Sequence, residues 1–201
     1  VSRLERHVET FSTGPFDPER ELSQLEDAVR TAQSELDSMA ERAASTEQAI
    51  LQFQSMMLDD EGMMNEVRFC IKAGISAAAA MDKVGQRYAD QLANMKDNPY
   101  MQLRSVDILD ATSRVINILG NRPRMWLALD HPVILAADRL MPTDLFSVPS
   151  GMILGVVTTE GSGQSHAAII ARAMNIPGIV QAGADFLEDC DGRTVILDAT
   201  K

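Results

Sequence analysis

The stretch Gly161-Ser162-Gly163-Gln164-Ser165-His166-Ala167-Ala168-Ile169-Ile170-Ala171-Arg172 places one histidine where a loop of small residues becomes an apolar helix. The apolar run at residues 153–157 before it has the character of a buried strand, and serine is a favoured N-cap at position 165. We therefore expect a strand, a loop and a helix start, in that order. His166 falls in the first helical turn, where unpaired backbone N–H groups and the helix dipole favour an anion and an unprotonated imidazole.

Two interpretations of His166 remain open at this level. An isolated histidine at a helix start most often caps the helix or packs against it. Residues 174–180, however, have the pattern of a helix stop followed directly by a short apolar strand. The loop is then held between two buried strands, which favours a neutral, nucleophilic histidine whose phosphorylated form is stabilised.

The whole segment resembles the phosphohistidine signature of the phosphoenolpyruvate-utilising enzymes. That signature is roughly Gly-Gly-Arg-Thr-Ser-His, then Ala or Thr, two aliphatic residues, Ala-Arg, and an Ile-Pro-Ala-Ile-Val-like strand. The resemblance implies that His166 is the catalytic, phosphorylated residue. The helix side of the signature is intact, whereas Ser162, Gly163 and Gln164 stand where the family has its second glycine, arginine and threonine.

These changes alter the chemistry that the loop offers to a phosphate. Loss of the arginine removes a bidentate phosphate partner, and loss of the threonine removes a hydroxyl group near the histidine. Arg172 is as compatible with a solvated helix position as with a structural or phosphate-facing role. The residues expected to support the phosphate are Gly161, Ser162, Gly163, Gln164, Ser165 and Arg172.

Composition narrows the class of protein. The chain has 201 residues, 45% of them hydrophobic, and its 29 acidic and 18 basic side chains give a net charge of −11. We expect one or two domains, with no secretory or membrane-spanning segment. The acidic balance argues against nucleic acid and anionic membranes and suits a basic protein partner. Two widely separated cysteines without metal-ligand spacing predict reduced thiols and a cytoplasmic location.

The first part of the chain is helical in pattern, from residue 19 to about residue 120. Four long amphipathic helices and one shorter segment after the second of them predict an antiparallel bundle. Gly120 fits a left-handed C-terminal cap for the last of these helices. The candidate N-caps of the four long helices are Asp17, Ser45, Ser76 and Asn98.

The rest of the chain alternates short strands and helices. Residues 133–137 are a predicted strand, 142–146 a short helix and 194–198 a last strand, with the unit around His166 between them. The fold class is therefore α+β. We expect a helical subdomain at residues 1–125 and a small α/β subdomain at residues 126–201, which the resemblance implies is a swivelling phosphohistidine subdomain.

This order is similar to the amino-terminal half of the Enzyme I family of the sugar phosphotransferase system, over nearly the whole chain. Pyruvate phosphate dikinase and phosphoenolpyruvate synthase share the histidine motif, but in them an ATP-grasp domain precedes it, and none is recognisable here. The resemblance implies a phosphoenolpyruvate-protein phosphotransferase. Such an enzyme takes a phosphoryl group from phosphoenolpyruvate on His166 and passes it to the histidine-containing phosphocarrier protein.

The resemblance also implies what this sequence lacks. In the family, a carboxy-terminal barrel binds phosphoenolpyruvate and Mg²⁺, and a first strand opens the chain. We expect both to be missing here, so that the sequence is a fragment with no metal site of its own. The family implies a homodimer for the full-length protein and a monomer for the fragment.

A carrier-docking surface is expected on the helical subdomain. A methionine patch rimmed by carboxylates suits a small basic protein. The methionines are equally compatible with positions in the core, and the acidic residues with a solvated turn. Tyr100 and Arg104 are also compatible with an ordinary helix surface. The resemblance to the Enzyme I family, which carries a helix–turn rich in methionine and acidic residues and a fourth helix that faces the carrier, implies the docking residues. They are Met56, Met57, Asp59, Asp60, Glu61, Tyr100 and Arg104.

Two other functions remain open. The altered loop is compatible with a non-catalytic interaction module that no longer carries phosphate. An Enzyme I-like segment also occurs in the multiphosphoryl protein of dihydroxyacetone kinase. A parent chain with a full barrel would indicate Enzyme I, whereas fused carrier domains would indicate the kinase system.

Overall fold

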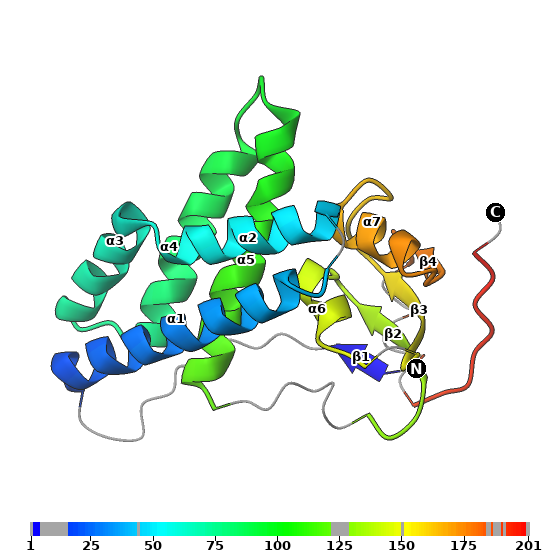
Figure 1. Cartoon of the computed structure of the whole chain (residues 1–201), viewed down its shortest axis with the longest axis horizontal. Coiled ribbons are helices and arrows are strands. Elements are labelled where there is room, and N and C mark those ends of the chain that lie inside the picture. The colour runs from blue at the N-terminus through cyan, green and yellow to red at the C-terminus, as the bar shows by residue number, and fades with distance from the viewer. Residues whose placement is uncertain are drawn as a thin grey trace. The chain divides into compact units, whose positions relative to one another are not determined.

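The chain forms two compact units, which are described one at a time (Figure 1). The computed structural model describes residues 2–4, 16–43, 45–121, 129–149, 151–183, 186, 190 and 192–199. One unit comprises residues 7–123, and the other combines residues 1–6 with residues 124–201. The expected subdomain boundary between residues 125 and 126 lies outside the described residues.

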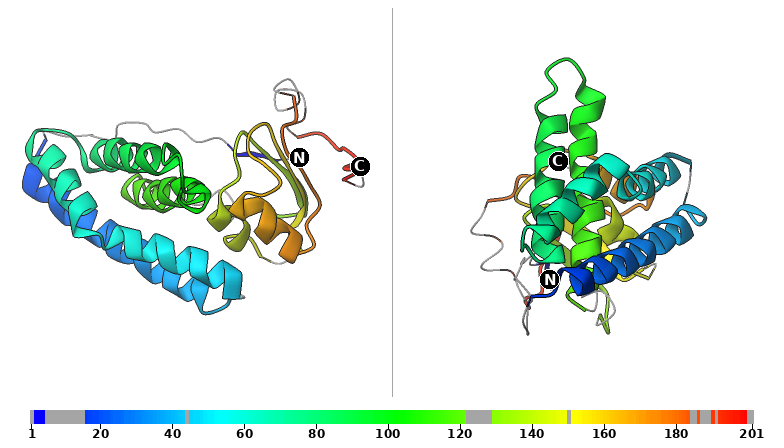
Figure 2. Two further views of the ribbon diagram at one scale, coloured as in Figure 1. Left: turned by 90° about the horizontal axis from the view of Figure 1, so that it is seen from above. Right: turned by 90° about the vertical axis from the view of Figure 1, so that its left-hand side faces the viewer.

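The first unit is a helical bundle, as the periodicity predicts. Consecutive helices α1 and α2 lie side by side, and α4 and α5 form a second pair with the most extensive contact in the unit (Figure 2). The helix α5 also packs against α1 and α2, so it joins the two pairs. The helices are α1 (Pro18–Ala40), α2 (Ser45–Leu58), α3 (Glu61–Lys72), α4 (Ala77–Ala93) and α5 (Pro99–Leu119).

Three of the four predicted N-caps are confirmed, whereas Ser45 is itself the first residue of α2. Asp17, Ser76 and Asn98 each accept a hydrogen bond from a backbone N–H two or three residues further on, as predicted for N-caps. The prediction of a left-handed Gly120 is wrong, because this residue has a φ of −76°. The next residue, Asn121, takes the positive φ of 47° instead. Asparagine tolerates this conformation better than most residues other than glycine, so it ends the helix equally well.

A row of buried polar groups on α5 connects this helix to its neighbours. The Asp110 carboxylate accepts a hydrogen bond of 3.0 Å from the Gln54 side chain on α2. Arg114 donates one of 2.8 Å to Glu35 on α1. Both Asp110 and Arg114 are buried. Because a buried charge that loses its partner is costly, these bonds favour one register of α5 against α1 and α2.

The second unit contains a parallel sheet whose described strands lie in the order β1-β2-β3-β4. Leu135 on β2 lies opposite Val156 on β3, and Val157 on β3 opposite Ile179 on β4. The helices α6 and α7 contact each other beside the sheet (Figure 2). The elements are β1 (Ser2–Leu4), β2 (Val133–Ala137), α6 (Pro142–Phe146), β3 (Ile153–Thr158), α7 (His166–Ala173) and β4 (Gly178–Ile179).

Two strand predictions need correction. The sequence assigns Ser2–Leu4 to the helical subdomain, but these residues form β1 and pair with β2. Three residues are too short for a periodicity signal, and their partner lies more than 130 residues away in the sequence. Residues 194–198 were expected to form a last strand, yet they belong to no strand. The Leu197 side chain instead occupies the space beside Gly155, where a Cβ would clash with it.

Gly85 allows the close approach of α4 and α5. A Cβ at this position would lie 2.7 Å from the Thr112 Cγ2 atom on α5. We predict that Gly85→Ala lowers the free energy of unfolding by about 1–3 kcal/mol, although alanine is the better helix former. Adding Thr112→Ala should recover much of the loss, because it removes the two closest atoms, Cγ2 and Oγ1, and leaves only the Cβ atom at 3.0 Å. Chemical denaturation followed by circular dichroism measures both, and equal stability of Gly85→Ala and the parent would contradict the packing argument.

Candidate functional site

His166 lies at the end of the connection that leads from the carboxyl end of β3 into α7. Ligands of parallel α/β sheets bind at this edge, because the connecting loops there open onto helix N-termini. The predicted order of strand, loop and helix is confirmed, and His166 is the first residue of α7. Its side chain is half-buried.

The first part of the loop is fixed to the end of β2. The Thr159 N–H donates to the Ala137 carbonyl oxygen at 3.2 Å, and the Glu160 N–H donates to that of Asp138 at 2.8 Å. Arg139 forms an ion pair of 2.7 Å with the Glu160 side chain. The chain therefore leaves β3 along a defined path before it reaches the glycines.

The second part of the loop is held by its serines. The Ser165 N–H donates to the Ser162 carbonyl oxygen at 3.1 Å, and the Gln164 N–H to the Ser162 Oγ atom at 3.3 Å. The Ser165 Oγ atom accepts from the Ala168 N–H at 3.2 Å, which confirms the predicted N-cap. Ser162, which replaces a glycine of the family signature, thus stabilises the turn.

The start of α7 provides the electrostatic setting of the histidine. The first N–H groups of a helix lack intrahelical acceptors. Of these groups, the Ala168 N–H donates to the Ser165 Oγ atom. The positive end of the helix dipole favours an anion near His166. A phosphoryl group on the imidazole would therefore lie in a favourable field.

Arg172 lies near the tip of the loop. It is exposed on α7, and a Cβ placed on Gly163 would be 4.0 Å from its Nη1 atom. Position 163 is where the family signature carries its arginine. A guanidinium group is therefore present beside this position, although it comes from the helix.

The other histidines do not join this site within the described part of the chain. His131 pairs with the adjacent Asp130 before β2, and this hydrogen bond lowers the pKa of the Asp130 carboxyl group. His7 lies outside the described residues. No three His, Cys, Asp or Glu side chains in the described ranges gather closely enough to hold a metal ion.

The methionines and acidic residues expected for docking lie at the junction of α2 and α3. Met56 is 62% exposed, Met57 is half-buried, and Asp59 and Glu61 are exposed. Asp60 has a structural task, because its carboxylate accepts a hydrogen bond of 2.7 Å from the Met63 N–H and caps α3. The turn itself is thus built partly from one of its acidic side chains.

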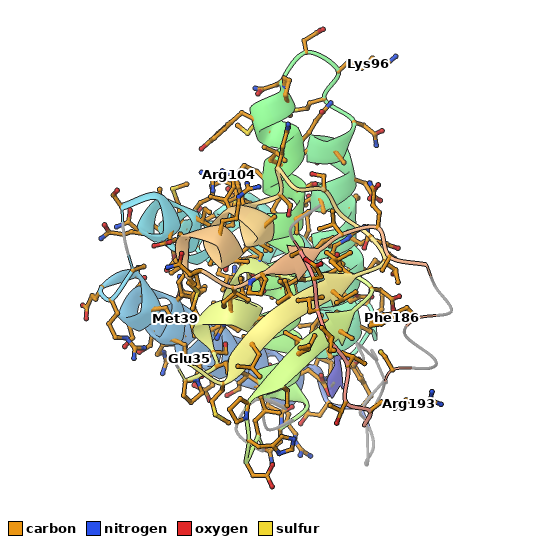
Figure 3. All side chains as sticks on the ribbon, turned by 90° about the vertical axis from the view of Figure 1, so that its right-hand side faces the viewer. Glu35, Met39, Lys96, Arg104, Phe186 and Arg193 are labelled. Carbon is orange, nitrogen blue, oxygen red and sulfur yellow. The ribbon has the colours of Figure 1, made fainter. Side chains whose placement is uncertain are left out.

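Tyr100 and Arg104 differ from each other in exposure. Tyr100 is 57% exposed, whereas Arg104, which is labelled in Figure 3, is only 5% exposed. The expected surface position of Arg104 is therefore wrong. The Arg104 guanidinium lies over the rings of Phe53 and Tyr100, 4.6 and 4.9 Å from their centroids, and pairs with Asp107 at 3.0 Å. It also donates to the Tyr100 hydroxyl group and so orients an exposed aromatic ring.

Sequence reasoning missed two residues, one beside the proposed docking residues and one beside the loop that precedes His166. Phe53 contacts Arg104, and this contact depends on how α2 and α5 pack. Gln181 follows β4 and donates a hydrogen bond of 3.1 Å to the Gly161 carbonyl oxygen in the loop. No periodicity or motif marks this second contact, because it joins positions twenty residues apart.

Comparison with known proteins identifies the family. Residues 3–104 match the model of the PEP-utilising enzyme, N-terminal, and residues 129–201 match that of the PEP-utilising enzyme, mobile domain. The chain belongs to the family of phosphoenolpyruvate-utilising enzymes, with the N-terminal and mobile domains that make up the amino-terminal domain of Enzyme I. The α+β fold with a helical bundle and a small parallel α/β unit is thereby confirmed.

Similar proteins are longer than this chain. It is 33% identical over 98% of its length to the "Multiphosphoryl transfer protein" of Rhodobacter capsulatus, of which it covers 24%. It is 31% identical over 88% of its length to the "Phosphoenolpyruvate-protein phosphotransferase" of Haloferax volcanii, of which it covers 32%. The chain therefore spans about a third or less of these relatives.

Two solved structures share the fold. A solution structure of Enzyme I superposes with a TM-score of 0.69 at 24% identity, over 94% of this chain and 77% of that one. The N-terminal domain of Enzyme 1 – Nitrogen gives a TM-score of 0.68 at 26% identity, over 92% and 80%. In the described part of the present chain, no helix has the length and apolar character needed to cross a membrane.

The N-cap at Ser165 provides a direct test of how the loop is held. We predict that Ser165→Ala weakens the first turn of α7 by about 1 kcal/mol, because the Ala168 N–H loses its acceptor. Ser165→Asp should retain the turn, since a carboxylate caps equally well. Hydrogen exchange of the α7 amides measures the local free energy. Unchanged exchange in Ser165→Ala would show that the cap does not hold the helix start.

Proposed function

We propose that this chain is the phosphoryl-relay part of a phosphoenolpyruvate-protein phosphotransferase, with His166 as the residue that carries the phosphoryl group. The observation behind this is the position of His166 as the first residue of α7, directly after a serine-capped loop at the carboxyl edge of a parallel sheet. Membership in the phosphoenolpyruvate-utilising enzymes supports the same chemistry. Support for the phosphate is proposed to come from residues 161–165 and Arg172.

The reaction requires an unprotonated imidazole nitrogen. In the first transfer, this nitrogen attacks phosphorus, the bond from phosphorus to the enol oxygen breaks, and enolpyruvate leaves and converts to pyruvate. In the second, a histidine nitrogen of the carrier attacks the same phosphorus, and the bond to His166 breaks. Phosphoryl transfer needs mainly positioning and charge stabilisation, which a helix start and a nearby guanidinium supply.

Arg172 is the proposed replacement for the arginine that the loop has lost. Its guanidinium lies beside Gly163, and a planar guanidinium can bind two phosphate oxygens at once. Glycine at position 163 leaves space for the Arg172 side chain. An arginine at position 163 would compete for the same space. The altered loop is thus compatible with transfer, in contrast to the interpretation as a non-catalytic interaction module.

The partner on the helical unit is proposed to be the histidine-containing phosphocarrier protein. An exposed methionine, an exposed tyrosine oriented by a buried arginine, and the acidic side chains of Asp59 and Glu61 are suited to a small basic surface. Arg104 contributes by holding Tyr100 and not by touching the partner. Mg²⁺ would act together with phosphoenolpyruvate in a barrel of the full-length enzyme, which we take to be a cytoplasmic homodimer.

A second parent protein is supported by one of the relatives. The "Multiphosphoryl transfer protein" of Rhodobacter capsulatus matches 98% of this chain. The same relay module would then work beside fused carrier domains, with the chemistry at His166 unchanged. The length of the parent gene and the domains that it encodes distinguish the two cases.

The site assignment predicts which histidine is labelled. Incubated with phosphorylated carrier protein, the chain should form an acid-labile phosphoryl adduct, because a phosphorus–nitrogen bond is hydrolysed in acid. His166→Ala should abolish the adduct, whereas the control His131→Ala should label like the parent. Labelling of His166→Ala at the parent level would place the phosphohistidine elsewhere. A parent chain that never labels would favour the non-catalytic interaction module.

The docking surface predicts a salt-dependent affinity. Asp59→Asn combined with Glu61→Gln should weaken carrier binding roughly tenfold at low salt and much less at high salt, because two rim charges steer the partner. Asp60 is left unchanged, since it caps α3. The control is the double variant Glu26→Gln with Asp37→Asn, which changes the net charge by the same amount at exposed positions on α1. Titration calorimetry at low and high salt measures the affinity of each variant for the carrier. Equal weakening in this control would show that net charge, and not this surface, governs binding.

A further inference from the structure

Gln181 has a backbone conformation that its residue type disfavours. Its φ is +59°, in the left-handed region, where a side chain with a Cβ is strained. The other non-glycine residues with positive φ in the described ranges are Asn121 and Asn175, and asparagine tolerates this region several-fold better. An ordered residue held in such a conformation needs interactions that maintain it.

Two sets of hydrogen bonds maintain Gln181. The Ala182 N–H donates to the Thr158 carbonyl oxygen at 2.9 Å, which fixes the backbone just after β4 to the end of β3. The Gln181 side chain turns toward the loop, and its Nε2 atom donates to the Gly161 carbonyl oxygen at 3.1 Å. The unusual φ therefore directs a side-chain amide onto the loop that leads to His166.

Gly161 is the position of the loop where such a contact has most effect. Its φ of +101° is available to glycine at little cost, so the chain can pivot here. On the β3 side, Thr159 and Glu160 are bonded to residues after β2, and on the α7 side Ser162 and Ser165 form the turn before the helix. The bond from Gln181 restrains the joint between these two ordered parts.

We propose that Gln181 is a positioning residue for the phosphoryl-transfer site, which restrains Gly161 and thereby holds residues 162–165 in place ahead of His166. This inference rests on the proposed function for its catalytic consequence. The restraint itself concerns only the loop and is measurable without phosphate. Gln181 does not touch the reacting atoms and acts only through Gly161.

The test uses a substitution that preserves the backbone and removes the amide. Gln181→Gly adopts the same φ without strain, so its melting temperature should change by no more than about 3 °C, because relief of strain offsets the greater freedom of glycine in the unfolded chain. Asn175→Gly, at the other left-handed non-glycine residue in the described part of this unit, is the matched control.

Two measurements follow on each variant. Backbone ¹⁵N order parameters of residues 161–164 should fall from about 0.85 toward 0.6 in Gln181→Gly alone. With phosphorylated carrier as substrate, kcat for labelling His166 should fall about fivefold, equivalent to about 1 kcal/mol, while KM stays unchanged because the proposed docking residues lie on other elements. A residue that only stabilises the fold would not separate kcat from the melting temperature in this way.

Each outcome decides one of the two proposals. Unchanged order parameters in Gln181→Gly would overturn the restraint, and so would equal losses in Asn175→Gly. A looser loop with an unchanged kcat would overturn the role of Gln181 in transfer. If the parent chain is never labelled, the proposed function fails, and the order parameters still decide whether Gln181 holds the loop.

Discussion

The hydrogen-bonding needs of a helix start govern the candidate site. A helix leaves its first N–H groups without intrahelical acceptors, and here Ser165 caps α7 so that His166 becomes its first residue. The parallel pairing of β2, β3 and β4 brings that helix start to the carboxyl edge of the sheet. Without the cap, the histidine would not have a defined relation to the positive end of the helix dipole.

The loop between β3 and α7 combines rigid flanks with glycines. Backbone hydrogen bonds to residues after β2 fix its beginning, and the turn formed by Ser162 and Ser165 fixes its end. Glycines at positions 161 and 163 give the chain freedom at the joint and leave space beside Arg172. A phosphate on His166 would thus meet a loop whose ends are fixed and whose tip is open, which suits a group that must arrive and leave.

The helical unit uses buried polar groups for a different purpose. On α5, Arg104, Asp110 and Arg114 are buried, and each has a partner from a nearby element or from its own helix. These bonds add little net stability, but breaking one of them leaves a charge uncompensated. At one end of this row, the exposed ring of Tyr100 is held by Arg104. The same device therefore supports both the packing of the bundle and the surface proposed for docking.

The sequence by itself determined the elements whose signals are local. The cap at Ser165, the start of α7 at His166 and the helices of the bundle follow from capping residues and periodicity over a few turns. The loop's resemblance to a phosphohistidine signature also needed only adjacent residues. Tertiary structure alone decided the pairing of β1 with β2, the burial of Arg104, the capping task of Asp60 and the contact of Gln181 with Gly161. The strand pairing, the burial and the Gln181 contact depend on groups distant in sequence. The capping task depends on which of several neighbouring acidic residues faces a helix start, and only the folded chain selects it.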